Sequence, residues 1–407
     1  MGAKQSRRAS FIELGDVESN LRATMLHSSR NMVLGVVVND RTIDELEESA
    51  TQEEIDATID LIAPMYSDQG RVIRHYRPHR AWLWRRWYGT VFQYGLKTAA
   101  SFMALAAFVS FIVPLLGDPE DGDDSVGYCL RAFNLVWKYV LTLTTFILAF
   151  FLNQSYALWR DAYNLSRALQ DRASDLSMLL ATHSDRDGNG KYTPEAKKLN
   201  DEIASAMRFF FAMVYASETR AFRILHTDRA LERMVERDVT TQEIVDALHD
   251  LSIEPADRVF AIIEWIIIKF RLARENGTLK GTPGFDGQYL SNALNLRSSY
   301  SAFGNLLSAR IPLAYGHFVQ IMVDVLLFSA PLACYKEMGY FSIVAVGILS
   351  IFFAGLLDLS KVMLDPLDNE DYCDGAIDLN VGVFIRESNN ASVKFYKGAE
   401  RLPSGWL

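Results

Sequence analysis

Four long stretches without charged side chains constrain this chain more than any other feature of its sequence. Residues 98–116, 139–159 and 338–357 carry no charge over 19, 21 and 20 positions. A fourth stretch, 311–335, covers 25 residues and is interrupted only by Asp324. A helix that rises about 1.5 Å per residue needs about 20 residues to cross a hydrocarbon core of about 30 Å. The sequence therefore predicts an all-α membrane protein with four transmembrane helices.

The composition indicates that a water-exposed part accompanies these helices. Half of the 407 residues are hydrophobic and 22% are charged, with a formal net charge of −9. An acidic chain without a basic face is not typical of nucleic-acid binding, so we expect no nucleic-acid partner. The three cysteines lie far apart, which excludes a disulfide framework and a cysteine zinc site. The chain lacks the common catalytic motifs, and we expect no enzymatic activity.

Charged residues beside the apolar stretches predict the orientation in the membrane. Six arginines between residues 71 and 86 are interleaved with aromatic residues, as in a basic cytosolic flank that carries an aromatic belt. The connection after the first stretch is acidic, which fits the opposite side. We therefore expect both termini in the cytosol, with residues 117–130 and 335–338 on the other side of the membrane.

These expectations divide the chain into five parts. They are a partly helical cytosolic N-terminal extension (1–70), the first two transmembrane helices (71–159), a cytosolic helical domain (160–310), the last two transmembrane helices (311–357) and a cytosolic acidic segment with a tail (358–407). In the extension, the capping-box patterns Thr42-x-x-Glu45 and Thr51-x-x-Glu54 predict helix starts. In the tail, the alternation of Val381, Val383 and Ile385 predicts a strand.

The N-terminus resembles a lipidation signal. Gly2 is followed by Ala3-Lys4-Gln5-Ser6, the pattern of N-myristoylation, and then by two arginines. Myristoylation at Gly2 would favour the plasma membrane, with lipid as a partner of the chain. Residues 19–38 contain serine and arginine but no acidic residue, so a plastid membrane stays open as the alternative.

Two acidic sequences have the composition of cation sites. The run that begins at Asp365 continues with Glu370, Asp371 and Asp374, and clustered carboxylates suit a hard cation such as calcium. The same run can also be a solvated acidic turn. The other sequence, 185–190, matches half of an EF-hand loop, but Ala196 stands where the closing glutamate belongs, so we interpret it as a loop between helices.

Polar residues inside the apolar stretches are a third kind of candidate. Asp324 lies in the middle of its stretch and seven residues after His317, so both lie near one face of a helix. A carboxylate within a membrane normally faces a cavity or a partner. Asp324 is either a proton-linked, pore-facing group or a hydrogen-bonding partner for a neighbouring helix.

Thr142, Phe146 and Phe150 recur every four residues in the second stretch, and Asn153 and Gln154 follow them. Such a stripe is usually a packing face towards lipid or another helix. The polar residues at one end indicate instead that water reaches this face.

Several segments together resemble the bestrophin family. The second stretch with Trp159-Arg160-Asp161-Ala162-Tyr163-Asn164-Leu165 after it is similar to the family's neck helix. Trp87-Tyr88-Gly89-Thr90-Val91-Phe92, Asn295-Leu296-Arg297, Ile311-Pro312-Leu313-Ala314-Tyr315 and Asp365-Pro366-Leu367 resemble other family motifs. They occur in the family's order over residues 75–390.

The resemblance implies a homopentamer around one central pore that passes chloride or bicarbonate. It implies a narrow neck lined by Thr142, Phe146 and Phe150, and a second cytosolic aperture near Phe285. It also implies a calcium clasp in the acidic segment, with carboxylates from Asp371 and Asp374 beside Asp365 and Glu370. This chain departs from the family at Thr142, where a branched apolar residue is usual, and at Tyr372 and Cys373, which interrupt the acidic run.

Two other functions compete with the anion channel. A proton-coupled anion transporter would depend on Asp324 and His317. A membrane scaffold without a pore would use the cytosolic domain to bind partners.

Overall fold

The computed structural model describes residues 41–62, 72–73, 85, 90–116, 125–309, 311–369 and 377–400. All regular secondary structure in these residues is helical, apart from two isolated bridges between extended residues. The chain divides into a small unit, Met1–Ser49, and a large unit, Ala50–Leu407. The predicted all-α class is therefore confirmed for the part of the chain that the structure describes.

The two predicted capping boxes form as hydrogen-bonded helix starts. In the small unit, α2 (Ile43–Ser49) follows Thr42, whose N–H donates to Oε2 of Glu45 at 2.8 Å while Thr42 Oγ1 accepts the Glu45 N–H at 3.3 Å. In the large unit, α3 (Gln52–Ile62) follows Thr51, which exchanges the same pair of bonds with Glu54 at 3.0 and 3.2 Å. Each box gives partners to two N–H groups that a helix start would leave unbonded.

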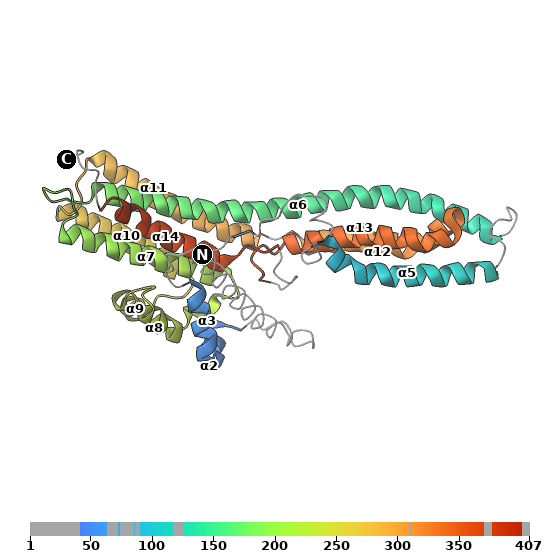
Figure 1. The fold of residues 1–407 in the computed structure, drawn as a ribbon, viewed down its shortest axis with the longest axis horizontal. Coiled ribbons are helices and arrows are strands. Elements are labelled where there is room, and N and C mark those ends of the chain that lie inside the picture. The colour runs from blue at the N-terminus through green and yellow to red at the C-terminus, as the bar shows by residue number, and fades with distance from the viewer. Residues whose placement is uncertain are drawn as a thin grey trace, which may run out of the picture. The chain divides into compact units, whose positions relative to one another are not determined.

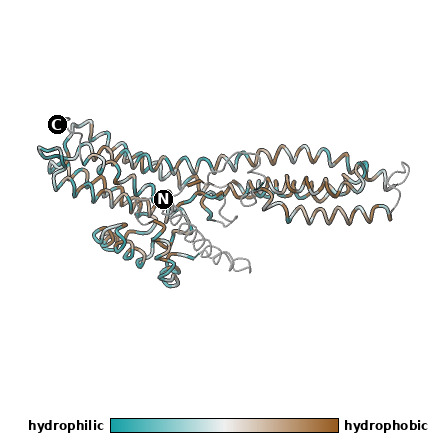
Figure 2. The backbone as a smooth tube through the Cα atoms, in the orientation of Figure 1, coloured by the Kyte–Doolittle hydropathy of each residue, from teal (hydrophilic) through white to brown (hydrophobic). Residues whose placement is uncertain are grey.

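The large unit contains a group of helices with apolar surfaces, which we call the apolar bundle (Figures 1 and 2). It consists of α5 (Val91–Leu116), residues 125–155 of α6 (Ser125–His183), α12 (Leu313–Met338) and α13 (Ser342–Met363). Helix α13 packs along α5, and α12 packs along α6. Three stretches of the described residues are long and apolar enough to cross a membrane, Gly95–Leu115, Gly127–His183 and Leu313–Met363. Together they identify a membrane protein.

The last of these stretches contains two of the helices. Helices α12 and α13 pack against each other and are joined by the short 3-10 helix η2 (Gly339–Phe341). The predicted connection around Lys336 and Glu337 is therefore displaced by a few residues, because the helix continues to Met338. Gly339 ends it with a φ of 55°, a conformation that glycine adopts without a steric penalty. The count of four membrane crossings remains a prediction.

The remaining helices of the large unit form what we call the globular bundle, which has its own core. It consists of α3, residues 156–183 of α6, α7 (Pro194–Glu218), η1 (Arg223–His226), α8 (Asp228–Glu236), α9 (Gln242–Asp250), α10 (Arg258–Glu275), α11 (Pro283–Ser308) and α14 (Val381–Gly398). Helix α7 contacts α6, α10, α11, α14 and η1. Residues 209–216 of α7 are buried on all sides, which explains their uninterrupted apolar sequence.

The predicted boundary between residues 159 and 160, where the chain is expected to leave the membrane, falls inside one helix and remains a prediction. Helix α6 runs without interruption from Ser125 to His183, 59 residues in all, and passes through both bundles (Figure 1). Its sequence contains no proline, and its only glycine is Gly127 near the start. Nothing in the sequence therefore breaks the backbone hydrogen bonds where the apolar residues give way to polar ones.

The strand that was predicted after residue 377 is wrong, because residues Val381–Gly398 form the helix α14. Val381, Val383 and Ile385 are all buried, but so are Phe384 and Ser388, and this pattern follows the helical period. The helix starts at Asn380, whose Oδ1 accepts the Val383 N–H at 3.1 Å. Three alternating apolar residues fit the two-residue period of a strand as well as one side of a helix. The N-cap at Asn380 favours the helix.

Candidate functional site

The stripe predicted on the second apolar stretch lies on an exposed face of α6. Phe146 and Phe150 are 72% and 51% exposed, and Thr142 is exposed with its hydroxyl donating to the Lys138 carbonyl at 3.0 Å. The opposite face of the same helix is buried, with Leu148 and Phe151 at 2% and 1%. The apolar bundle thus uses one side of α6 for its core, and none of the residues that the structure describes covers Phe146 and Phe150 on the other side.

The same face of α6 becomes polar below Phe150. Steps of three, seven and four residues, which keep to one face of a helix, lead from Phe150 to Asn153, Arg160 and Asn164, and all three are exposed. Phe108 on α5, which is 61% exposed, also lies on a face that leads to exposed polar residues, Ser101 and Lys97. The exposed stripe of α6 is therefore a face that lipid, water or another copy of the chain can contact.

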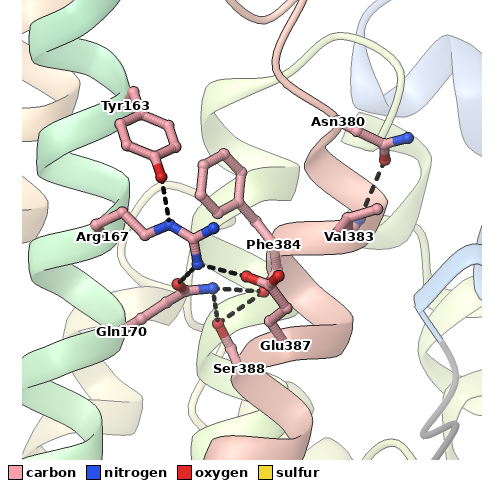
Figure 3. Close-up of polar contacts among 8 residues, drawn as sticks. All are labelled: Tyr163, Arg167, Gln170, Asn380, Val383, Phe384, Glu387 and Ser388. Atoms are coloured by element: carbon pink, nitrogen blue, oxygen red, sulfur yellow. Dashed lines mark hydrogen bonds and ion pairs between the residues drawn. The ribbon is translucent and has the colours of Figure 1, made fainter. Parts of the chain in front are cut away.

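Farther along α6, a group of polar contacts fastens α14 to it (Figure 3). Arg167 forms an ion pair with Glu387 and donates to Gln170 Oε1 at 2.7 Å. Gln170 in turn donates to the Phe384 carbonyl at 2.9 Å and to Ser388 Oγ at 3.0 Å. Because the donors and acceptors of both helices are matched in this way, the position of α14 along α6 is fixed.

The described residues on both sides of 370–376 are hydrogen-bonded to the globular bundle. Before this range, Asn369 Oδ1 accepts the Arg220 N–H at 2.8 Å, and Asn369 Nδ2 donates to the Glu218 carbonyl at 2.9 Å. After it, the Trp159 indole N–H on α6 donates to the Ile377 carbonyl at 3.2 Å. Helix α6 therefore carries the phenylalanine stripe and also holds the end of the acidic segment.

Of the four predicted calcium ligands, the structure describes only Asp365. Its side chain is 6% exposed, and one carboxylate oxygen accepts the Asn369 N–H at 2.8 Å. Glu370, Asp371 and Asp374 lie outside the described residues. No group of three potential ligands that could hold a metal occurs in the described ranges. Asp365 thus has the contacts of a turn residue, and calcium binding stays a prediction.

The other acidic sequence forms a loop between α6 and α7. Asp187 Oδ1 accepts the N–H groups of Asn189 and Lys191, both at 2.9 Å. Asp185 pairs with Lys280. Its carboxylates are occupied within the protein, as expected of a loop that connects two helices.

Asp324 lies in a polar network that links α12 to α13. Gln320 Nε2 donates to Oδ1 and Oδ2 of Asp324 at 2.8 and 2.9 Å. Lys361 Nζ on α13 donates to Gln320 Oε1 at 2.6 Å and lies 3.9 Å from Asp358 Oδ1. His317 is exposed and does not join this network. The geometry favours the hydrogen-bonding role of Asp324 over a role in proton transfer with His317.

Phe285, the predicted aperture residue, lies in the core of the globular bundle. It is 6% exposed, and its ring stacks on His183 with 3.7 Å between the ring centres. Phe270 approaches it from α10 with its ring centre at 5.5 Å. A ring enclosed in this way does not line an open passage, so the contacts argue against Phe285 as an aperture residue. The lipidation site, Gly2, lies outside the described residues.

Two buried titratable groups were not among the sequence candidates. Burial raises the pKa of Glu218, while its hydrogen bond with Tyr300 acts in the opposite sense. Burial, followed by the charges of Arg258 and Arg223, lowers the pKa of His226 to about 3. Glu218 ends an apolar segment of α7 and His226 ends η1, and neither is part of a sequence motif.

Solved structures share this arrangement, although the sequence comparisons find no relative. No family model and no curated protein matches the sequence. The crystal structure of a bacterial bestrophin homologue from Klebsiella pneumoniae matches 75% of this chain and 99% of its own, with 16% identity and a TM-score of 0.55. Two single-residue variants of that homologue match 73% of this chain with TM-scores of 0.56 and 0.57. The chain therefore has a bestrophin-like fold.

Proposed function

We propose that this protein is a bestrophin-like anion channel, in which copies of the chain surround a central pore and α6 lines its neck. The observation that carries the proposal is the exposed face of α6, where Phe146 and Phe150 lie above exposed polar residues. Five copies, the number implied by the resemblance, would close Thr142, Phe146 and Phe150 into three successive rings. In a channel, the exposed face of α6 would line the pore, and the opposite face would pack into the core of the apolar bundle.

The aromatic rings suit an anion passage for a physical reason. The edge of a phenylalanine ring carries partial positive charge, so a ring of edges attracts an anion that has lost part of its water. A narrow apolar ring is also a barrier, because an ion that enters it loses hydration. Chloride and bicarbonate are the anions that we propose as permeant. Phe285 is not part of the proposed pore because it is buried.

Recording from purified protein in planar bilayers tests the neck. We expect Phe146→Ala and Phe150→Ala to increase the open current several-fold, because they widen and hydrate the constriction. The matched control is Phe108→Ala on α5, a phenylalanine whose exposure lies between those of Phe146 and Phe150 and that is outside the proposed pore. If both α6 variants behave like the control in assembled protein, the stripe contacts lipid or another chain and the neck assignment is wrong.

Thr142 tests the departure from the family. A hydroxyl in the first ring offers a polar contact to water, so Thr142→Ile should lower the basal current and leave the oligomer unchanged. Reversal potentials in opposed chloride and bicarbonate gradients measure which anion passes. A preference for cations would contradict the anion channel.

The topology and the regulation of the channel are further parts of the proposal. We propose a cytosolic globular bundle, so that cysteines introduced at Asp121 and Lys191 label from opposite sides of the membrane. We also propose that Asp371 and Asp374 bind calcium at micromolar concentration, as sensor sites do. Asp374→Ala should then shift the calcium dependence of the current to higher concentration. Currents that are indifferent to strong chelation would identify the acidic run as a turn.

A further inference from the structure

A single positive charge lies on the phenylalanine stripe of α6. Between Lys138 and Arg167, the only charged residues in the sequence of this helix are Arg160 and Asp161. Two steps of seven residues lead from Phe146 through Asn153 to Arg160, and such steps keep to one face of a helix. The Arg160 side chain is 55% exposed. The exposed face that carries the phenylalanines therefore also carries a cation that solvent can reach.

The side chain of Arg160 is directed towards the phenylalanines. Helical side chains lean towards the N-terminus of their helix, and Phe150 is N-terminal to Arg160. The guanidinium carbon lies over the ring of Tyr156, 5.9 Å from its centre, and Tyr156 is four residues nearer to Phe150. The ten residues from Phe150 to Arg160 correspond to about 15 Å along the helix, and the lean of the side chain shortens this distance.

Among the described residues, the charge of Arg160 is only weakly paired. Its Nε lies 3.8 Å from Oδ1 of Asp161, and both side chains are about half exposed. An exposed pair of this kind leaves both charges hydrated. Consecutive helical residues point about 100° apart, so Asp161 does not share the stripe with Arg160. Arg167, in contrast, is engaged by Glu387 and Gln170, and its charge is used within the fold.

We propose that Arg160 concentrates anions at the mouth of the neck beside the globular bundle and sets the anion preference of the pore at low salt. This inference rests on the proposed channel, in which five copies would bring five guanidinium groups around one axis. Positive charges along a narrow passage raise the local concentration of anions and lower that of cations. The phenylalanine edges act on an anion that has lost water, whereas Arg160 acts on hydrated anions before they enter the neck.

The salt concentration determines the size of this effect. The Debye length is about 30 Å at 10 mM salt and about 3 Å at 1 M. Five charges about 15 Å from the last phenylalanine ring are therefore weakly screened at 10 mM and almost fully screened at 1 M. The local chloride concentration should rise about fourfold at 10 mM and hardly change at 1 M.

The conductance of the purified full chain in planar bilayers, measured in symmetrical KCl from 10 mM to 1 M, tests this inference. Arg160→Gln should lower the conductance about fourfold at 10 mM and leave it unchanged at 1 M. The ratio of chloride to potassium permeability should fall in the same variant at 10 mM. Arg160→Lys keeps the charge and should behave like the unsubstituted protein.

The matched control is Arg172→Gln, which should have no effect at either salt concentration. Arg172 lies on the same helix and its side chain is 44% exposed. It follows Arg160 by twelve residues, so it points about 120° away from Arg160 around the helix and is off the stripe.

A second measurement changes the charge within one assembled channel. Arg160→Cys is combined with Cys129→Ser and Cys373→Ser, and the channel is treated with trimethylammonium-ethyl or sulfonatoethyl methanethiosulfonate. The cationic reagent should restore the conductance at 10 mM, and the anionic reagent should lower it further. The same chain with Arg160 intact shows how the reagents act on the buried Cys334 alone.

Three results would overturn the proposal. If Arg160→Gln and Arg172→Gln conduct equally at 10 mM and the anion current persists, Arg160 lies away from the ion path, and the proposed channel still stands. If Arg160→Gln lowers the conductance by the same factor at 10 mM and 1 M, and both reagents act alike, Arg160 has a packing role. If the unsubstituted protein passes no anion current, the channel proposal fails and this inference fails with it.

Discussion

The two parts of α6 differ in whether the side chains that point away from the bundle core contact another helix. In the globular bundle, Arg167 and Gln170 are matched by Glu387, Phe384 and Ser388 of α14. In the apolar bundle, the same helix presents Phe146 and Phe150 with 72% and 51% of their surfaces exposed. In the first part, polar side chains of α6 find their partners on α14 of the same chain, while in the second part Phe146 and Phe150 are not covered by any residue that the structure describes.

This difference distinguishes side chains that stabilise the fold from side chains that are available for function. A phenylalanine that is buried in the globular bundle contributes to folding through the area it removes from water. A phenylalanine on the stripe contributes little to folding, because the folded chain leaves it exposed. The same residue type should therefore give opposite phenotypes in the two bundles.

The largest expected effect comes from one substitution made in both places. Phe303 on α11 is fully buried and packs edge to face against Tyr215 with ring centres 6.1 Å apart. We expect Phe303→Ala to lower the free energy of unfolding by about 3–5 kcal/mol. Phe146→Ala should lower it by less than about 1 kcal/mol and change the current instead. Thermal unfolding in detergent measures the first effect, and equal losses of stability would break the comparison.

Acid should affect the globular bundle through His226. Its pKa in the folded protein is about 3, so the folded state stays unprotonated while the unfolded chain binds a proton below about pH 6.5. This contribution to stability is complete above about pH 6.5 and is lost as the pH falls towards 3. Between pH 6.5 and 5 the loss is about 1.6 kcal/mol.

The matched variant for the acid effect is His226→Gln, which should flatten the dependence of the unfolding temperature on pH over this range. Glu218 acts with the opposite sign, because its raised pKa gives stability that is lost as the pH rises through the folded value. Unfolding temperatures that fall equally in both proteins between pH 6.5 and 5 would show that other groups carry the acid sensitivity.

The attachment of α14 provides a smaller effect. Arg167→Ala removes the ion pair with Glu387 and leaves Tyr163 and Gln170 without their donor. The contact is partly exposed, so we expect a loss of about 1–2 kcal/mol, seen as faster hydrogen exchange in residues 381–398. Arg172→Ala is the control, because Arg172 makes an exposed ion pair at 3.8 Å with Asp175 on its own helix and does not contact α14. Equal hydrogen-exchange rates in the two variants would mean that the Arg167 contact holds α14 no better than an exposed ion pair.

The smallest expected effect concerns the end of the acidic segment. Trp159→Phe keeps an aromatic ring and removes the indole N–H that donates to the Ile377 carbonyl. We expect a loss of about 0.5–1.5 kcal/mol, which should appear as faster proteolysis after residue 369. Unchanged cleavage would mean that the bonds of Asn369 alone hold this segment.

The sequence was informative where one physical signal dominates. The uncharged stretches identified the apolar helices, and Thr42 and Thr51 identified two helix starts through side chains that bond locally. The continuity of α6 was not predicted, since hydropathy changes at Trp159 while helix propensity does not. The tail was misread because three alternating residues fit two periods. The pKa shifts of Glu218 and His226 come from burial in the tertiary structure, which no local sequence pattern predicts.

The unbroken course of α6 has a mechanical consequence. Without a hinge residue, its 59 residues connect the contact at Arg167 to the exposed side chain of Phe146 through continuous helix. The 21 positions between these residues correspond to about 32 Å, so a tilt of about 5° at the held end displaces Phe146 by about 3 Å. A displacement of that size is about the width of a water molecule, so a small tilt of α6 about its contact with α14 would move the phenylalanines by as much as one water molecule occupies.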